Sequence, residues 1–349
     1  MKAYVFGAGA SVQAGYPLAS RLLHALSDWL DSRQADKESL FWVEPCRNRM
    51  VQIRETFGSL DSLESVLGKL ETCGTNRFKP TSATTYRQDQ KDIAHDVMEH
   101  MMGRGCGNLD DAAEGFYPQY LRSDLVTAFR EMFYFIEESR VGENAYDTFA
   151  QAVRCDSGFI TFNYDVALER ALAQAGKWDV GTGYWFRPFI DREVPSCTVH
   201  KLHGSVNWFK EPIQEYGAPH LFPRDLRILG YPDLSDPTVP NGMGVDNTST
   251  FIFPNPNKSF YWERLWVPLW QSAAEKLRAA DEIFIHGYSM PTADERGRAL
   301  CFENPSKQVR INIHCLGDSD RVAGEFRSQG FTNVRAYPDI GFEAWAASL

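Results

Sequence analysis

The stretch AYVFGAGAS, residues 3–11, decides the fold of this 349-residue chain. Four residues typical of a buried strand lead directly into a turn of small residues, and a helix is expected from about Pro17. Small residues at 7–11 let backbone amides approach a pyrophosphate, and the start of a helix favours an anion there. A tight strand-to-helix turn that binds nothing has the same pattern, so this stretch alone leaves both interpretations open.

Three further motifs repeat this arrangement of an apolar run followed by a polar or small-residue turn. They are GFITFNYD at 158–165, TVHKLHGS at 198–205 and EIFIHGYSMP at 282–291, and shorter apolar runs lie at 310–316 and 333–337. Strands that alternate with helices and end in such turns predict an α/β fold with a doubly wound, mostly parallel sheet. Loops after the carboxyl ends of parallel strands converge on one crevice, so we expect the motifs to share a site.

The organisation of the chain follows from where this pattern is interrupted. We predict a Rossmann-like domain from residues 1–30 and 151–349, and a helical insertion subdomain at 31–150. Within the insertion, 74–118 is polar and has little periodicity. Residues 210–260 hold eight of the 18 prolines. They are therefore interpreted as a long surface segment of the Rossmann-like domain, and as a candidate lid.

A helix expected at 260–280 places large apolar residues on one face. Apolar side chains at helical spacing are the usual signature of a face that packs against the core. We therefore interpret as core the residues Trp262, Leu265, Trp266, Leu269 and Trp270.

Composition excludes several classes of protein. The net charge of -10, with no basic run, argues against direct nucleic-acid binding. No apolar run is long enough to span a bilayer, and the start does not resemble a secretory leader, so we expect a cytoplasmic protein without a membrane partner. The seven cysteines include no C-x-x-C pair. A structural zinc site is therefore not expected, and the cysteines are predicted to be reduced.

Two side chains at the predicted strand ends are candidates for catalysis. Asn163 projects at the carboxyl end of its strand, whereas Asp165 is also well placed to cap the next helix. His203 titrates near neutrality, which suits a general base, although a lone histidine is more often a structural hydrogen-bonding residue. Val12 stands where a dinucleotide fingerprint has its third glycine after Gly9, and this disfavours a hydride-transfer dehydrogenase.

Taken in order, these motifs resemble a known family. GAGAS (7–11) with AGYP (14–17), TFNYD (161–165), KLHGS (201–205) and GYS (287–289) are similar to motifs of the sirtuin fold. The resemblance is closest to the sirtuin-like NAD hydrolases of bacterial anti-phage defence, and it extends from residue 1 to about 320. It implies NAD as substrate and Asn163 and His203 as catalytic residues. The positions that it implies for NAD binding are Gly7, Ala8, Gly9, Ala10, Ser11, Pro17, Thr161, Phe162, Asp165, Gly204, Gly287, Tyr288 and Ser289.

The chain departs from deacetylase sirtuins in two places. Their zinc ribbon, with two C-x-x-C pairs, is missing, and Leu18-Ala19-Ser20-Arg21 replaces their Asp-Phe-Arg. The resemblance therefore implies hydrolysis of the nicotinamide N-glycosidic bond, without a metal, rather than deacylation. The alternatives are a protein deacylase or ADP-ribosyltransferase of the same fold, and a non-catalytic NAD or ADP-ribose sensor. A pure binder needs neither Asn163 nor His203, which argues against the sensor.

The same resemblance implies how such an enzyme is restrained. An unrestrained NAD hydrolase would harm its host, so self-assembly or a separate partner must control it. We expect a homo-oligomer, with a hexameric translocase ATPase or another defence-system sensor as candidate partner.

Overall fold

The computed structural model describes residues 1–33, 47, 50–51, 128–184, 197–210, 226–228, 249–251 and 263–349. The chain divides into two compact units, one formed by Met1–Ala19 with Arg130–Leu349 and the other by Ser20–Phe129. The inserted unit therefore has different limits from the predicted 31–150, because residues 130–150 belong with the sheet. The predicted polar middle of the insertion, 74–118, lies outside the described residues.

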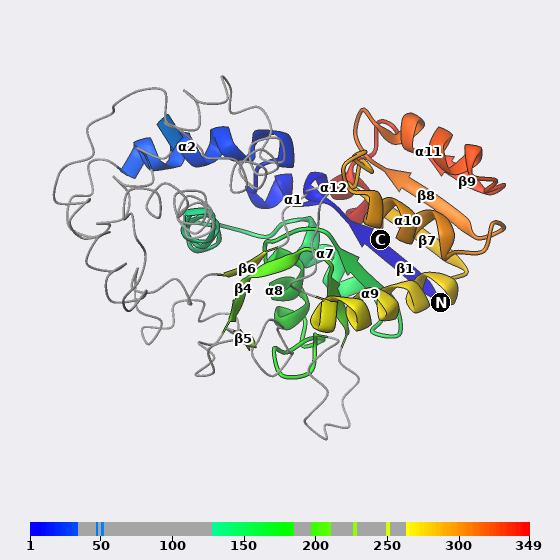
Figure 1. Cartoon of the computed structure of the whole chain (residues 1–349), viewed down its shortest axis with the longest axis horizontal. Coiled ribbons are helices and arrows are strands. Elements are labelled where there is room, and N and C mark those ends of the chain that lie inside the picture. Colours follow the sequence, from blue (N-terminus) through cyan, green and yellow to red (C-terminus); the bar gives the residue numbers. More distant parts are fainter. Residues whose placement is uncertain are drawn as a thin grey trace, which may run out of the picture. The chain divides into compact units, whose positions relative to one another are not determined.

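A six-stranded parallel sheet, in the order β3-β2-β1-β7-β8-β9, forms the centre of the first unit (Figure 1). This confirms the predicted α/β, Rossmann-like fold. The strand order runs outward from β1 in one direction and from β7 in the other, so it reverses between these two strands, and ligands of open α/β sheets commonly bind at the carboxyl ends beside such a reversal. The strands are β1 (Lys2–Phe6), β2 (Gly158–Thr161), β3 (Val199–Lys201), β7 (Glu282–His286), β8 (Arg310–His314) and β9 (Val334–Ala336).

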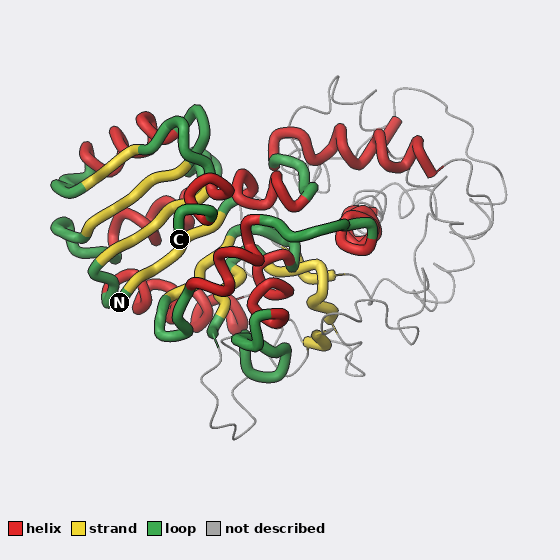
Figure 2. Tube along the Cα trace, turned by 180° about the vertical axis from the view of Figure 1, so that it is seen from behind, coloured by secondary structure: helices red, strands yellow, loops and turns green. Residues whose placement is uncertain are grey.

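Helices cover both faces of this sheet (Figure 2). The ring of Tyr4 lies 5.0 Å from Phe149 of α7 (Ala145–Ala152), and Phe6 lies 5.5 Å from Phe342 of α12 (Phe342–Ala346). On the opposite face, His200 Nε2 lies 2.9 Å from the Ser272 hydroxyl of α9 (Glu263–Arg278). No described helix is long and apolar enough to cross a bilayer. This unit also contains α8 (Ala167–Gln174), α10 (Glu295–Glu303) and α11 (Ser319–Ser328).

The segment after β1 differs from the single helix predicted from about Pro17. A short helix, α1 (Ala8–Ser11), follows the strand at once, and 3₁₀ turns at Val12–Ala14 and Ala19–Arg21 come before α2 (Leu22–Ser32). Gly15 ends the first of these turns with φ +90°, a conformation that breaks the helical path. Within α2, the leucines at positions 22, 23, 26 and 30 are buried, whereas Leu18, which precedes this helix, is exposed.

The TVHKLHGS motif, interpreted as one strand and its turn, contributes to two strands in different sheets. After β3 the chain turns at Gly204, whose φ is +83°, and continues as β4 (Gly204–Lys210). β4 forms a three-stranded antiparallel sheet with β5 (Leu226–Ile228) and β6 (Ser249–Phe251). The 210–260 segment therefore contributes two strands and is not a loop throughout, and its remaining residues lie outside the described part of the chain.

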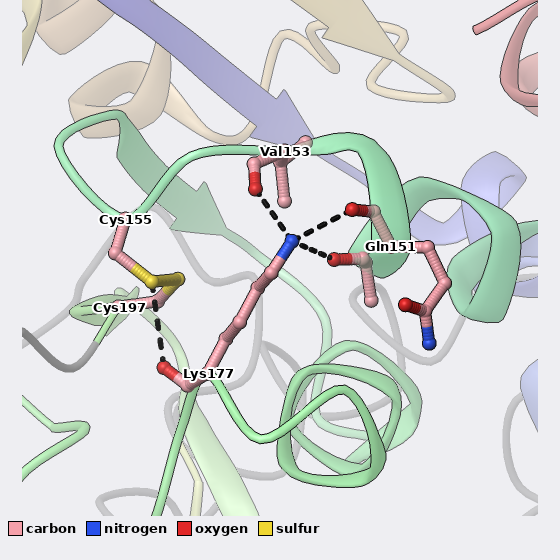
Figure 3. The surroundings of a disulfide bond; sticks show 6 residues. Gln151, Val153, Cys155, Lys177 and Cys197 are labelled. Carbon is pink, nitrogen blue, oxygen red and sulfur yellow. Dashed lines mark hydrogen bonds between the residues drawn. A yellow bond between two sulfur atoms is a disulfide. The ribbon is translucent and has the colours of Figure 1, made fainter.

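A disulfide joins Cys155 and Cys197, whose Cα atoms lie 4.2 Å apart (Figure 3). The prediction of reduced cysteines is wrong for this pair. Each cysteine shortly precedes one of two paired parallel strands, β2 and β3, so the pairing brings both to the amino edge of the sheet. Beside the disulfide, the Lys177 ammonium donates hydrogen bonds of 2.7–2.8 Å to the carbonyls of Ala150 and Gln151 in α7 and of Val153, which follows this helix.

Candidate functional site

The four strand-end motifs lie side by side at the carboxyl edge of the parallel sheet. In each motif, the backbone amide that follows the strand donates to the last carbonyl of a neighbouring strand. This arrangement extends the sheet by one residue beyond each strand, so the turns emerge together. The bonds are Gly7 N to His286 O (2.9 Å), Phe162 N to Phe6 O (3.0 Å), Leu202 N to Thr161 O (3.0 Å) and Gly287 N to His314 O (3.0 Å).

The first and last of these turns pack backbone against backbone. A Cβ atom on Gly7 would lie 2.5 Å from Tyr288 Cα, and one on Gly287, where φ is +62°, would lie 2.2 Å from Ala10 N. The Gly9 amide donates to Gly287 O at 3.0 Å, and the Ala10 amide donates to Gly7 O at 2.9 Å. These glycines are therefore required by the contact between the turns. The amides of Gly9 and Ala10 donate within the protein, and binding of a diphosphate by residues 7–11 remains a prediction.

Asn163 joins the end of β2 to the first turn. Its Nδ2 donates to Gly7 O at 3.0 Å and to Ser11 Oγ at 2.9 Å, and the residue is 7% exposed. Its backbone amide donates to Thr161 Oγ1 at 3.0 Å. Ser11 in turn lies 3.1 Å from the Tyr146 hydroxyl. The predicted catalytic amide thus holds two strand ends together, and its role toward a substrate remains a prediction.

Asp165 and the lysine of the KLHGS motif belong to a buried charged cluster. Asp165 Oδ1 accepts from Ala167 N, the first residue of α8, at 3.1 Å, although the N-cap position of this helix is Val166 and not Asp165 as predicted. The Lys201 ammonium, with no exposed surface, donates to Asp165 O and lies 2.8 Å from Glu169 Oε1. Burial raises the pKa of both Asp165 and Glu169, and the Lys201 charge opposes this. Sequence reasoning did not identify Lys201 or Glu169, although a lysine within a buried strand is a detectable signal.

His203 is buried among aromatic rings just beyond β3. It is 4% exposed, and its ring meets Phe162 edge-on at 5.1 Å and lies 6.3 Å from Trp270. Trp270 was predicted to belong to the core but is half-buried beside this histidine, whereas Trp266 and Leu269 are core residues as expected. The aromatic rings restrict access of water to the imidazole.

Asp294 is the neighbour of His203 that sequence reasoning missed. His203 Nε2 lies 3.4 Å from Asp294 Oδ1, and Asp294 is 1% exposed. The Tyr288 hydroxyl donates to Asp294 Oδ2 at 2.7 Å, and Gly297 N donates to Oδ1 at 3.3 Å. An aspartate directly before a helix indicates an N-cap, and Asp294 is the N-cap of α10. Nothing in the neighbouring sequence indicates that it also lies beside a histidine.

The predicted NAD-binding residues fall into two groups. One group has its side chains engaged in the interior: Tyr288 stacks on Phe162 at 4.1 Å, and Thr161 and Asp165 make the bonds described above. Gly204 lies buried in the turn between β3 and β4. The second group is half-buried and so can meet a ligand at the sheet edge. It consists of Ala8, Gly9, Pro17, Gly287 and Ser289.

The described residues reveal no metal centre, and the comparisons with known proteins identify no family. Among the described residues, no three His, Cys, Asp or Glu side chains cluster as metal ligands would. The chain matches no family model and no curated protein sequence. The residues at the carboxyl edge of the sheet are therefore the basis for a functional proposal.

Proposed function

We propose that this protein is a NAD glycohydrolase, which cleaves NAD to nicotinamide and ADP-ribose. The observation that carries the proposal is the placement of His203, a buried imidazole, at the carboxyl edge of a Rossmann-like sheet. Tyr288, in the turn after β7, stacks on Phe162, and Phe162 contacts His203. The imidazole is thereby linked to the point where the strand order reverses, which is where sheets of this order bind dinucleotides.

The half-buried backbone at this edge supports binding of a dinucleotide. Ala8, Gly9, Gly287 and Ser289 are partly accessible, and they lie in the two turns on either side of the reversal. A hydride-transfer enzyme is less well supported because the third fingerprint glycine is replaced by Val12. The proposal is therefore a reaction on the glycosidic bond of the dinucleotide rather than on its nicotinamide ring.

The chemistry requires few groups. Nicotinamide leaves the ribose C1′ as a neutral molecule with the electron pair of the C–N bond, and a water oxygen bonds to C1′. His203 takes the proton that the water loses. Asn163 presents its amide oxygen to the water or to a ribose hydroxyl, and Phe162 and Trp270 limit access of bulk water. The products are nicotinamide, ADP-ribose and one proton.

The cellular role that we propose is depletion of NAD as an effector of bacterial anti-phage defence, in the cytoplasm. The order of the four motifs, with its resemblance to sirtuin-like NAD hydrolases, supports this role. Control by homo-oligomerisation or by a hexameric translocase ATPase belongs to the same proposal. No nucleic-acid partner is proposed, given the net charge of -10.

A second candidate is a non-catalytic sensor that binds NAD or ADP-ribose. Both hydrogen bonds from Asn163 Nδ2 go to protein groups, which a purely structural asparagine would also show. In a sensor, Asn163 only joins the turns and His203 only packs against the aromatic rings. The two candidates differ in whether nicotinamide is ever released.

The test is to incubate purified protein with NAD, alone and with candidate triggers, and to quantify nicotinamide by chromatography. His203→Ala should lower turnover by ~10²–10⁴-fold, because it removes the general base. NAD affinity, measured by calorimetry, should be affected less. His24→Ala, an exposed histidine of α2, is the matched control and should turn over NAD like the wild type.

Three results would argue against the proposal. Full hydrolysis by His203→Ala would refute the assigned base. Wild-type protein that binds NAD but releases no nicotinamide under any trigger would favour the sensor. ADP-ribosylated or deacylated protein as the main product would favour the transferase or deacylase alternative.

A further inference from the structure

We propose that Asp294 is a positioning residue for His203, which holds the imidazole with its proton on Nε2 so that Nδ1 is the nitrogen that accepts the proton. This inference rests on the proposed NAD hydrolysis for its catalytic meaning. The underlying observation is independent of it. A carboxylate that is 1% exposed lies 3.4 Å from a ring nitrogen that is itself buried.

Two described groups donate hydrogen bonds to Asp294, one to each carboxyl oxygen, which is the pattern that a carboxylate accepts. Burial raises the pKa of the Tyr288 hydroxyl well above its ordinary range, so this hydroxyl stays protonated and donates to Oδ2 at 2.7 Å. Gly297 N donates to Oδ1, and the positive end of α10 adds a favourable field. A nitrogen that faces an ionised carboxylate is stable there only if it carries a proton. His203 Nε2 therefore carries the proton, and Nδ1 has the lone pair.

At the start of α10, Gly297 leaves space for the Tyr288 hydroxyl and the Asp294 carboxyl because it has no side chain. A Cβ atom on Gly297 would lie 2.2 Å from the Tyr288 hydroxyl oxygen and 2.4 Å from Asp294 Oδ2. Phe162 meets the His203 ring edge-on and stacks on Tyr288, whose hydroxyl donates to Asp294. The carboxylate and the imidazole are thus each restrained by packing, as a positioning pair requires.

Of the described ionisable groups around the pair, Asp294 lies 3.4 Å from the imidazole. Burial and Asp294 both raise the pKa of the Cys301 thiol, which therefore stays neutral. Tyr164 lies 6.4 Å from the His203 ring, and the Arg296 guanidinium lies over Trp270 at 5.8 Å. When Nδ1 accepts a proton, the resulting imidazolium is stabilised by the adjacent carboxylate, and the 3.4 Å separation can shorten in the substrate complex.

The first experiment needs only the folded wild-type protein. Long-range ¹H–¹⁵N spectra of protein labelled at its histidines report which ring nitrogen carries the proton, and His203→Gln identifies the signal. We expect the Nε2–H tautomer at neutral pH. An Nδ1–H tautomer would overturn the inference, whether or not the protein hydrolyses NAD.

The second experiment replaces the carboxyl group of Asp294 by a neutral amide. In Asp294→Asn, the pH at which the His203 signals show half-protonation should fall by about 1 unit or more, because an opposite charge beside the ring is lost. Turnover should fall by ~10²–10⁴-fold in kcat with little change in KM, and the acidic limb of kcat against pH should move to lower pH. Asp156→Asn, the same substitution at an exposed aspartate whose side chain is 64% accessible, should match the wild type in all of these.

The outcomes separate this inference from the proposed function. An unchanged His203 titration in a folded Asp294→Asn variant would overturn the inference, as would wild-type turnover by that variant. Thermal unfolding establishes that the variant is folded, and Asp294→Glu, which keeps the charge, should titrate closer to the wild type than Asp294→Asn. If the titration moves as expected but wild-type protein never releases nicotinamide, the pairing stands and the proposed hydrolysis fails.

Discussion

At the scale of single residues, the most unusual feature is a lysine ammonium with no exposed surface. Lys201 lies between the Asp165 carbonyl and the Glu169 carboxylate, directly before the His203 turn. Tyr184 also donates to Glu169 Oε1, at 3.0 Å. A buried charge is tolerated only with partners of this kind, so each member depends on the others.

We predict that Lys201→Met destabilises the fold by about 3–5 kcal/mol, because it leaves the buried Glu169 carboxylate without its cation. Urea unfolding measures the loss as a lower transition midpoint. Lys2→Met, the same substitution at an exposed lysine of β1, is the control and should leave the midpoint close to the wild-type value. Equal midpoints for the two variants would show that the buried ion pair contributes nothing to stability.

At the scale of elements, two turns from distant parts of the sequence fit together through their glycines. The turn after β1 and the turn after β7 approach so closely that no side chain fits between them at Gly7, Gly9 or Gly287. They also flank the point where the strand order reverses. A change at this contact therefore affects both packing and the candidate site.

Gly287→Ala should destabilise the protein more than Gly317→Ala does. Both glycines have positive φ, +62° and +77°, so alanine is strained at either position by about 1–2 kcal/mol. Only at position 287 would the new Cβ also meet backbone, 2.2 Å from Ala10 N, whereas at 317 nothing lies within 4 Å. Thermal unfolding of both variants measures the difference, and similar melting temperatures would contradict the close contact of the turns.

The disulfide between the amino ends of β2 and β3 is also an element-scale feature. Closing a loop with a sequence separation of 42 residues restricts the unfolded chain. Loop-closure entropy puts the resulting stabilisation at ~4 kcal/mol. We expect reductant, or the Cys155→Ser/Cys197→Ser double variant, to lower the midpoint of urea unfolding. Cys301→Ser is not a suitable control because this free thiol is buried. Peptide mapping without reductant that finds both thiols free would show that the bond does not form.

At the scale of the whole molecule, three histidines of the central sheet are buried in their neutral form. Burial lowers the pKa of His200 and of His314 to about 4, and it lowers that of His286 well below the ordinary value. In the unfolded chain these side chains titrate near pH 6.5. Below that pH the unfolded state binds more protons, so stability falls as the pH falls. The buried carboxyls of Glu137, Asp165 and Glu169, whose pKa values burial raises, act in the opposite direction and reduce the net slope.

His286→Phe tests this pH dependence. Neither ring nitrogen of His286 has a hydrogen-bond partner within the described part of the chain, and its neighbours include Phe6, Phe342 and Trp345. The free energy of unfolding of the variant should fall less than that of the wild type between pH 6.5 and 5, by about 1 kcal/mol per pH unit. The free energy of unfolding in urea at several pH values gives both slopes. Identical slopes would mean that His286 is not held neutral in the folded protein.

The sequence by itself determined the parallel sheet and the side-by-side placement of its four turns. Each strand is a short apolar run that ends in its own turn residues, and both signals lie within a few consecutive positions. The carboxyl ends of parallel strands share one edge, so Asn163 and His203 could be assigned to one end of the sheet before any distance was known. The length of the TVHKLHGS strand was mistaken because a glycine turn sends the chain into a second sheet, and only the strand partners show this.

Only the tertiary structure decided which side chains meet. The contact of His203 with Asp294, the Lys201–Glu169 ion pair and the Cys155–Cys197 bond each join residues far apart in the chain or on different elements. Nothing in the local pattern distinguishes Asp294 from an ordinary helix cap, or Glu169 from a solvated residue of an amphipathic helix. Such pairs form because packing brings polar groups together in an interior where an unpaired charge is costly, and that cost depends on the whole fold.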